Sequence, residues 1–134
     1  MKIKICGITN LDDGLAAAQA GADFIGFIFH PKSARFVTIE QAQAIAAGVR
    51  RQFREKAPKS VGVFVNTTPA QVRYVLYTAG LDYAQLHGDE EPEQLAEQRG
   101  RGYKAVRPAS LDEALDAAAR YAPFGPQGGP NLLL

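Results

Sequence analysis

Short runs of apolar and β-branched residues alternate along the chain with longer stretches in which apolar residues recur every three or four positions. The short runs read KIKIC, FIGFIF, VGVFV, YAQLH, YKAV and NLLL. Two of the longer stretches have the spacing of one helix face. Their apolar positions are Ile39, Ala42, Ile45, Ala46, Val49 and Phe53 in the first, and Val72, Val75, Leu76 and Ala79 in the second. This alternation is typical of repeated βα units that wind around a parallel sheet.

Three helix starts are marked by polar side chains that can cap free backbone amides. In a capping box, a Ser or Thr side chain accepts from the amide three residues on, and the Glu or Gln there accepts from the cap residue's own amide. The pattern occurs as Thr38 with Gln41, Thr68 with Gln71, and Ser110 with Glu113. We therefore predict helices that begin directly after Thr38, Thr68 and Ser110.

Two parallel-sheet architectures fit this order of elements. A doubly wound, flavodoxin-like sheet of this length would be a non-catalytic binding or regulatory module like a phospho-receiver. However, the first predicted strand runs into Cys6, not the acidic pair of a receiver, and the third runs into Asn66, not a phospho-accepting Asp. A TIM (βα)8 barrel typically takes about 250 residues. Residues 1–134 would then form a single incomplete βα-barrel domain, with about five βα units and the start of strand six. We favour the barrel and keep the flavodoxin-like sheet as the alternative.

The composition favours a small-molecule partner. The 15 Lys and Arg residues against 14 Asp and Glu give a formal net charge of +1, so no field draws the chain to nucleic acid or to an anionic membrane. The apolar runs are far shorter than the roughly 20 residues that cross a bilayer, and MKIKICGIT lacks the apolar core of a signal peptide. The single cysteine, Cys6, excludes an internal disulfide and a cysteine metal cluster. We expect a cytoplasmic protein without a metal site.

Candidate chemistry gathers at the ends of the predicted strands, where parallel sheets place their active sites. Because side chains alternate between faces along a strand, Lys4 and Cys6 share a face. The positive charge of Lys4 would favour the thiolate that a basic or nucleophilic cysteine requires. Gln85 and His87 likewise share a face near the same edge. A buried inert cysteine, a surface lysine on an edge strand and a histidine that only caps a helix or loop remain the alternatives.

The loop after the second strand, HPKSARFV, contains a polar cluster suited to a carboxylate or a phosphate. Its members are His30, Lys32, Ser33 and Arg35. On spacing alone, Arg35 could equally be a solvated loop charge.

Taken together and in this order, these motifs resemble the phosphoribosylanthranilate isomerase family of tryptophan biosynthesis. The resemblance is carried by KICGIT, GADFIGFIF, SARFVT, VGVFVN, LDYAQLHGDE and KAVRP. It implies a βα barrel without a cofactor that performs an Amadori rearrangement of N-(phosphoribosyl)anthranilate to a ketose product. It also implies that Cys6 is the general base and that Arg35 holds the anthranilate carboxylate. Lys4, Gln85 and His87, which the strand pattern turns toward the same edge, are then candidate substrate contacts.

In that family the general acid is an Asp directly after the LLL of the sixth strand, and glycine-rich loops of the seventh and eighth units bind the substrate phosphate. Neither is present in the 134 residues, so we expect the chain to be inactive by itself. A barrel that is open beside its first and sixth strands would expose unpaired backbone groups. We therefore also expect self-association of the chain, or complementation by a separate chain that carries the remaining barrel.

Overall fold

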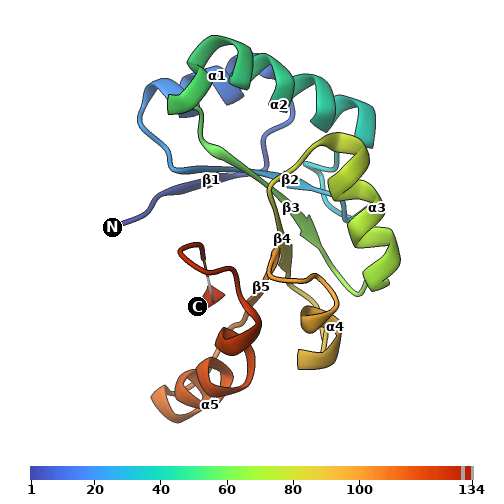
Figure 1. The fold of residues 1–134 in the computed structure, drawn as a ribbon, viewed down its shortest axis with the longest axis vertical. Coiled ribbons are helices and arrows are strands. Elements are labelled where there is room, and N and C mark those ends of the chain that lie inside the picture. Colours follow the sequence, from blue (N-terminus) through green and yellow to red (C-terminus); the bar gives the residue numbers. More distant parts are fainter. Residues whose placement is uncertain (131, 134) are drawn as a thin grey trace.

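The strands lie side by side in one parallel sheet and follow one another in the order of the sequence. The computed structural model describes residues 1–130, 132 and 133. The strands are β1 (Lys4–Cys6), β2 (Phe24–Ile28), β3 (Lys59–Phe64), β4 (Tyr83–Leu86), β5 (Gly102–Ala105) and β6 (Leu132–Leu133). Their order in the sheet is β1-β2-β3-β4-β5-β6, and every neighbouring pair is parallel. Figure 1 shows the sheet as a curved arc rather than a closed ring.

A helix follows each strand from β1 to β5. The helices are α1 (Leu11–Gln19), α2 (Ile39–Phe53), α3 (Pro69–Ala79), α4 (Pro92–Ala96) and α5 (Leu111–Tyr121), and the 3-10 turns η1 (Arg54–Lys56) and η2 (Ala122–Phe124) follow α2 and α5. All five helices lie outside the arc in Figure 1, so the concave face of the sheet carries no helix from the described residues.

This topology decides between the two predicted architectures. A flavodoxin-like sheet has the order 2-1-3-4-5 and helices on both faces, whereas the order here is sequential. The flavodoxin-like alternative is therefore wrong, and the five predicted βα units of a barrel-type sheet are confirmed. Leu132 and Leu133 pair with Lys104 and Ala105 of β5 as the start of the sixth strand. The other two residues of the predicted strand, 131 and 134, lie outside the described residues.

The three predicted helix starts are confirmed. The hydroxyls of Thr38, Thr68 and Ser110 each accept a hydrogen bond from the amide three residues on, at 3.2, 3.4 and 3.2 Å. The reciprocal bond is made at Thr38, whose amide donates to Gln41 Oε1 at 2.9 Å. Glu113 differs, because its carboxylate accepts from the amide of the residue before the cap, at 2.7 Å.

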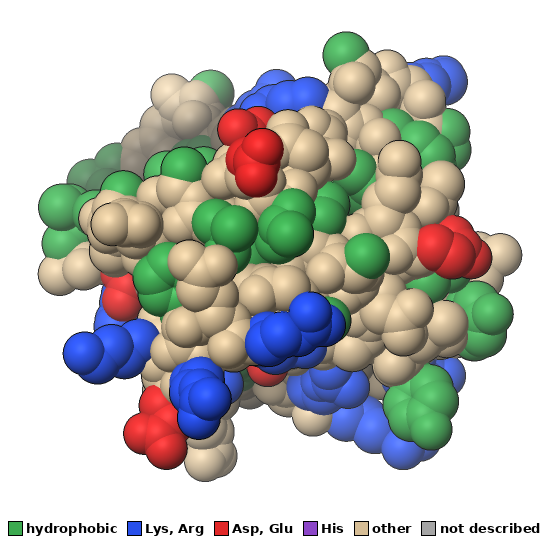
Figure 2. Space-filling model, turned by 90° about the horizontal axis from the view of Figure 1, so that it is seen from above, with side chains coloured by type: hydrophobic (Ala, Val, Ile, Leu, Met, Phe, Trp, Pro, Cys, Tyr) green, Lys and Arg blue, Asp and Glu red, His purple; other side chains and the backbone are tan. Residues whose placement is uncertain are grey.

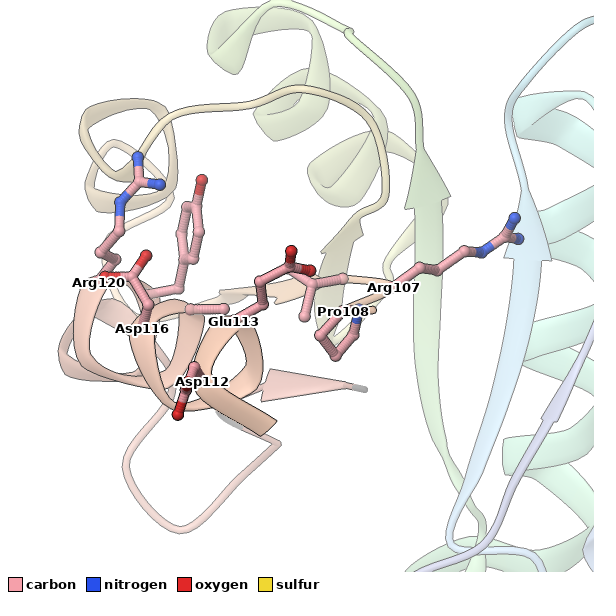
Figure 3. A pocket seen from close by; sticks show the side chains of 9 residues that line it. Arg107, Pro108, Asp112, Glu113, Asp116 and Arg120 are labelled. Carbon is pink, nitrogen blue, oxygen red and sulfur yellow. The ribbon is translucent and has the colours of Figure 1, made fainter. Parts of the chain in front are cut away.

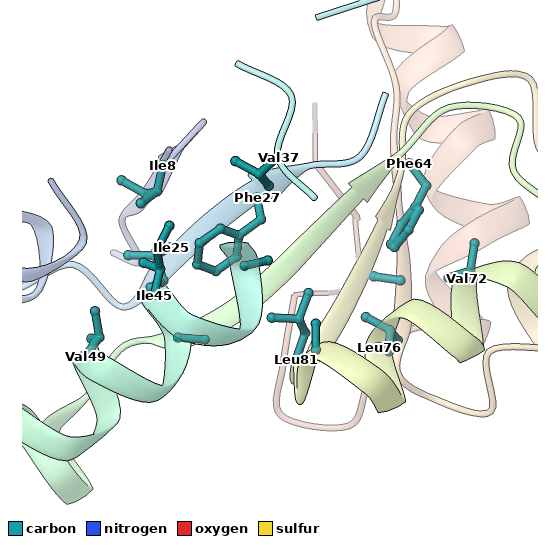
Figure 4. Packing of buried hydrophobic residues seen from close by; sticks show 14 of the residues in the cluster. Ile8, Ile25, Phe27, Val37, Ile45, Val49, Phe64, Val72, Leu76 and Leu81 are labelled. Atoms are coloured by element: carbon teal, nitrogen blue, oxygen red, sulfur yellow. The ribbon is translucent and has the colours of Figure 1, made fainter. Parts of the chain in front are cut away.

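The hydrophobic core lies between the convex face of the sheet and the helices. Ile25 and Phe27 of β2 belong to the same buried cluster as Ile45 and Val49 of α2 (Figure 4). These positions follow the two periods of the sequence, because every second strand residue and one helix stripe face the same layer. Because the apolar side chains pack on this side of the sheet, the alternate strand positions face the concave side.

Apolar side chains at both ends of the sheet are only partly covered. Ile3, directly before β1, and Ile5, within β1, are 45% and 42% exposed. Near the other end, Leu111 and Leu115 of α5 are 74% and 60% exposed. Among the described residues, apolar side chains are thus left partly exposed near both ends of the sheet.

Charges of both signs are scattered over the surface. In the view from above, Lys and Arg, Asp and Glu, and apolar side chains all lie on the same face, with several of the Lys and Arg side chains in the lower part of the view (Figure 2). Of the helices in the described part of the chain, none combines the length and apolarity that a membrane crossing needs.

Candidate active site

One cavity of about 430 Å³ lies on the concave face. It contains the candidate base, the candidate carboxylate-binding residue and the three candidate substrate contacts, which are Cys6, Arg35, Lys4, Gln85 and His87. It is lined by Lys4, Cys6, Ile28, His30, Ser33, Arg35, Val63, Val65, Gln85, His87 and Arg107. The residues come from β1, β2, β3 and β4 and from the segments that directly follow β2, β3, β4 and β5. The cavity therefore lies at the carboxyl-terminal edge of the parallel sheet, which we call the rim.

Lys4 and Cys6 lie together over a glycine of the neighbouring strand. Cys6 pairs in register with Gly26 of β2. A Cβ atom placed on Gly26 would lie 3.0 Å from Cys6 Sγ and 3.2 Å from Lys4 Cε. The predicted shared face of Lys4 and Cys6 is thus observed, and the missing side chain at Gly26 provides the space that both occupy. Cys6 is half-buried and has no disulfide partner within the described residues.

Arg35 lies against the turn that follows Cys6. Its Nη1 donates to the carbonyl oxygen of Cys6 at 2.9 Å, and its backbone amide donates to Ser33 Oγ at 3.2 Å. Gly7 has φ +85°, and a Cβ there would lie only 2.4 Å from Arg35 Nη1. The guanidinium group of Arg35, an exposed residue, is therefore hydrogen-bonded beside Cys6.

Gln85 and His87 are joined to a buried tyrosine that the sequence analysis did not single out. Tyr103 Oη donates to Gln85 Oε1 at 3.0 Å, and Gln85 Nε2 lies 3.4 Å from His87 Nδ1. Burial raises the pKa of Tyr103, so the phenol stays protonated and able to donate. The alternation that places Gln85 and His87 on one face could have identified Tyr103, because it stands two positions before Ala105 and four before Arg107 on β5 and its extension.

His87 is held toward its neutral form. Burial lowers its pKa first, and the positive charges of Arg107, Lys104 and Lys4 lower it further, while Glu90 opposes them. A neutral imidazole can donate with one ring nitrogen and accept with the other. His87 can therefore form hydrogen bonds with a ligand in the cavity without adding a positive charge.

Arg107 extends from the end of β5 toward the concave face. Figure 3 shows its side chain pointing away from Asp112, Glu113 and Asp116 of α5, with which it shares the lining of a second cavity of about 470 Å³. Because Arg107 also lines the first cavity, its guanidinium group is a further cation available to an anionic ligand there.

A second constellation, Glu90 with Lys104, lies behind the rim, on the helix-facing side of the sheet. Lys104 Nζ lies 2.6 Å from Glu90 Oε2. Asn66, which we placed at the sheet edge from the sequence, does not line the cavity, because its side chain accepts from the amide of Asp89 at 2.7 Å. The described residues contain no group of three or more His, Cys, Asp or Glu side chains placed to hold an ion.

The chain is similar to known isomerases. A family model described as N-(5'phosphoribosyl)anthranilate (PRA) isomerase matches residues 3–125. The N-(5'-phosphoribosyl)anthranilate isomerase of Geobacter sulfurreducens is 44% identical over 121 residues, which are 90% of this chain and 57% of that protein. That of Rubrobacter xylanophilus is 44% identical over 117 residues, which are 84% of this chain and 52% of that protein.

Solved structures give the same match. The phosphoribosyl anthranilate isomerase of Thermotoga maritima superposes with a TM-score of 0.80 at 36% identity, covering 89% of this chain and 57% of that one. A structure of a phosphoribosyl anthranilate isomerase in complex with reduced 1-(o-carboxyphenylamino)-1-deoxyribulose 5-phosphate also gives a TM-score of 0.80 at 36% identity, and covers 89% of this chain and 60% of that one.

The chain spans little more than half the length of the curated relatives that it matches. Within that span, the family model covers residues 3–125, and the sequential parallel sheet superposes on solved isomerase barrels. The resemblance predicted from the motifs is confirmed, and the chain belongs to the phosphoribosylanthranilate isomerase family.

Proposed function

We propose that this chain supplies the catalytic base and the carboxylate-binding site of a phosphoribosylanthranilate isomerase. The observation that carries the proposal is the placement of Cys6 and Arg35 in one cavity at the rim, with the Arg35 guanidinium group bonded to the Cys6 carbonyl. An aldose-to-ketose rearrangement needs a base that removes a proton from the sugar carbon next to the reacting one, and a thiolate can do this. It also needs the substrate to be held so that this carbon lies at the base.

In the proposed reaction, the bond between C1 and the ring oxygen of N-(phosphoribosyl)anthranilate breaks, the ring oxygen gains a proton, and an iminium with a carbon–nitrogen double bond at C1 is left. Cys6 removes the proton from C2, and the electron pair forms a double bond between C1 and C2 while the electrons of the carbon–nitrogen double bond return to nitrogen. Loss of the C2 hydroxyl proton and gain of a proton at C1 then give the ketose, so that no atom is gained or lost overall. Arg35 binds the anthranilate carboxylate in a charge-assisted hydrogen bond.

The remaining polar side chains of the cavity are assigned to substrate binding. Lys4 lies beside Cys6, and Gln85 and His87 line the same cavity. Since Gln85 is buried and bonded to Tyr103, its position is fixed before a substrate arrives. No cofactor takes part in this proposal.

We further propose that the 134-residue chain has no measurable isomerase activity by itself. Its relatives are nearly twice as long as the part matched here, and the family resemblance assigns the general acid and the phosphate-binding loops to segments that the chain does not contain. A positioned general acid typically contributes 10²–10⁴-fold. Binding energy from a remote phosphate also contributes to turnover in enzymes.

The test uses a chimera in which this chain is joined to the part of the Geobacter sulfurreducens relative that the match does not cover. We expect turnover of N-(phosphoribosyl)anthranilate by the chimera and none by the chain alone. Cys6→Ser should lower kcat about 10²-fold or more, because an alcohol is a far poorer base than a thiolate. Arg35→Ala should mainly raise KM, and Lys32→Ala, which removes a nearby cation that does not line the cavity, is its control.

An active chimera in which Cys6→Ser leaves kcat unchanged would contradict the assignment of the base. If Lys32→Ala raises KM as much as Arg35→Ala, the carboxylate site has been assigned to the wrong residue. Turnover by the purified 134-residue chain, with host enzyme removed, would refute the proposed inactivity.

A further inference from the structure

Glu90 and Lys104 form an almost completely buried ion pair immediately behind the rim. Their side chains are 1% and 4% exposed, and Lys104 Nζ lies 2.6 Å from Glu90 Oε2. Lys104 pairs in register with Leu86, on the sheet face opposite to that of Gln85 and Tyr103. The pair is thus separated from the cavity by the thickness of the sheet and does not contact the proposed substrate.

The pair binds the backbone at two points of the rim. Glu90 Oε1 accepts from the amide of Asn66 at 2.9 Å, and Glu90 Oε2 accepts from the amide of Gly88 at 2.8 Å. Lys104 Nζ also donates to the carbonyl oxygen of Gly88. Segments that follow β3 and β4 are therefore tied to the middle of β5 by a single carboxylate and a single ammonium group.

Both anchored residues come directly after residues that line the cavity. Val65 precedes Asn66, and His87 precedes Gly88. Gly88 is bound at its amide and its carbonyl oxygen, so the backbone on the carboxyl side of His87 is fixed. On the other side, the amide of His87 donates to the carbonyl oxygen of Phe64 at 2.9 Å.

Stability alone is a weak explanation for this arrangement. Removing two charges from water costs free energy that their attraction does not always offset, and apolar replacements of buried pairs are often neutral or stabilising. A function in fixing geometry is the better explanation here, because the pair's additional hydrogen bonds within the described residues all go to rim backbone.

We infer that Glu90 and Lys104 are positioning residues that hold His87 in place at the rim of the cavity. The inference rests on the proposed function for what His87 contacts, but the position of His87 can be measured without it. Displacement of a positioned group by about 1 Å can cost as much as 10²-fold in rate. The pair therefore influences turnover through His87 without touching the substrate.

The test compares two double variants that each remove one ion pair. Glu90→Gln with Lys104→Met removes both buried charges with little change in volume, so no unpaired charge is left inside. Glu91→Gln with Arg120→Met is the matched control, because that neighbouring pair is 2.9 Å long but exposed. Glu90→Gln alone and Lys104→Met alone complete the set.

The first measurement is ring-proton NMR of the 134-residue chain. It has two histidines, so His30 is an internal reference for His87. In the buried-pair variant we expect the His87 signals to shift or broaden, while those of His30 stay as in the wild type. The control pair should leave both unchanged. An unmoved His87 in a folded Glu90→Gln, Lys104→Met variant would overturn the inference.

The second measurement is the kinetics of the chimera carrying the same substitutions. We expect kcat/KM to fall about tenfold or more in the buried-pair variant, within the range that misplacement produces, and to stay unchanged in the control. A displaced His87 with unchanged kcat/KM would overturn the functional part of the inference. An inactive unsubstituted chimera would count against the proposed function alone, since the NMR comparison does not depend on turnover.

Discussion

Gly7→Ala tests whether the turn after β1 places Arg35 beside Cys6. Gly7 has φ +85°, a conformation that costs an L-residue about 1–2 kcal/mol. The new methyl group would also stand 2.4 Å from Arg35 Nη1 and 2.7 Å from its Cζ. Because these atoms end a flexible side chain, we expect Arg35 to swing away and to lose its bond to the Cys6 carbonyl oxygen.

Gly21→Ala is the matched control. Gly21 has φ +86°, and a Cβ atom there meets nothing within 4 Å among the described atoms. It therefore carries the backbone cost of about 1–2 kcal/mol without the collision. The net worth of the lost hydrogen bond is about 1 kcal/mol, so Gly7→Ala should lower the free energy of unfolding by about 1 kcal/mol more than Gly21→Ala.

The assay is urea unfolding of the 134-residue chain followed by far-UV circular dichroism, because the sequence contains no tryptophan. A double-mutant cycle with Arg35→Ala isolates the collision. In the Arg35→Ala background, Gly7→Ala should cost no more than Gly21→Ala. If Gly7→Ala costs the same with and without Arg35, the contact does not hold the guanidinium group and the reasoning is refuted.

Three further predictions follow from the buried polar groups and the open sheet. Tyr103→Phe should lower the free energy of unfolding by about 1–3 kcal/mol, because it leaves the buried Gln85 oxygen without its donor; in urea unfolding, Tyr77→Phe, at an 86% exposed site, should change nothing. Burial alone would raise the pKa of Glu90, but hydrogen bonds from Lys104 and the Asn66 amide outweigh it, so the folded pKa lies below the ordinary value of 4.5. The resulting stability is present above pH 4.5 and is lost as the pH falls through the folded pKa; the difference in unfolding free energy between wild type and Glu90→Gln should therefore narrow below pH 4.5, and a constant difference would contradict this. In light scattering, the apparent mass of the chain should rise with concentration and fall when the uncovered part of the Geobacter sulfurreducens relative is added as a separate chain; a strictly monomeric chain would contradict the predicted self-association.

Local periodicity was sufficient to predict most of the fold. The stripe from Ile39 to Phe53 coincides with α2, and the hydroxyls at Thr38 and Thr68 marked two of the helix starts. These signals come from residues that are close together in the sequence, so they can be recognised without the structure. The sequence did not decide between the strand orders of the two architectures, because strand order depends on which strands meet in space.

Strand alternation predicted one part of the candidate site. Alternation placed Lys4 with Cys6, and Gln85 with His87, before any contact was known. It could not show that Arg35 meets the Cys6 carbonyl, because that contact joins residues 29 positions apart through a loop. The HGDE motif also could not show that Glu90 is the buried acid. Adjacent acidic residues look alike in sequence, and only the packing around them distinguishes the buried one.

The register of strand β5 determines both the side chains at the cavity and the ion pair behind the rim. Tyr103 faces the cavity side and Lys104 the helix side, so a shift of one residue would reverse both. Gly102 opposes such a shift, because a Cβ there would lie 2.9 Å from Gln98 Cβ, and a slipped strand would bring a large side chain into that space. The close packing of Gly102 against the segment after α4 thus fixes Tyr103 toward Gln85 and Lys104 toward Glu90 at the same time. The same glycine therefore secures both the hydrogen bonds within the cavity and the ion pair behind it.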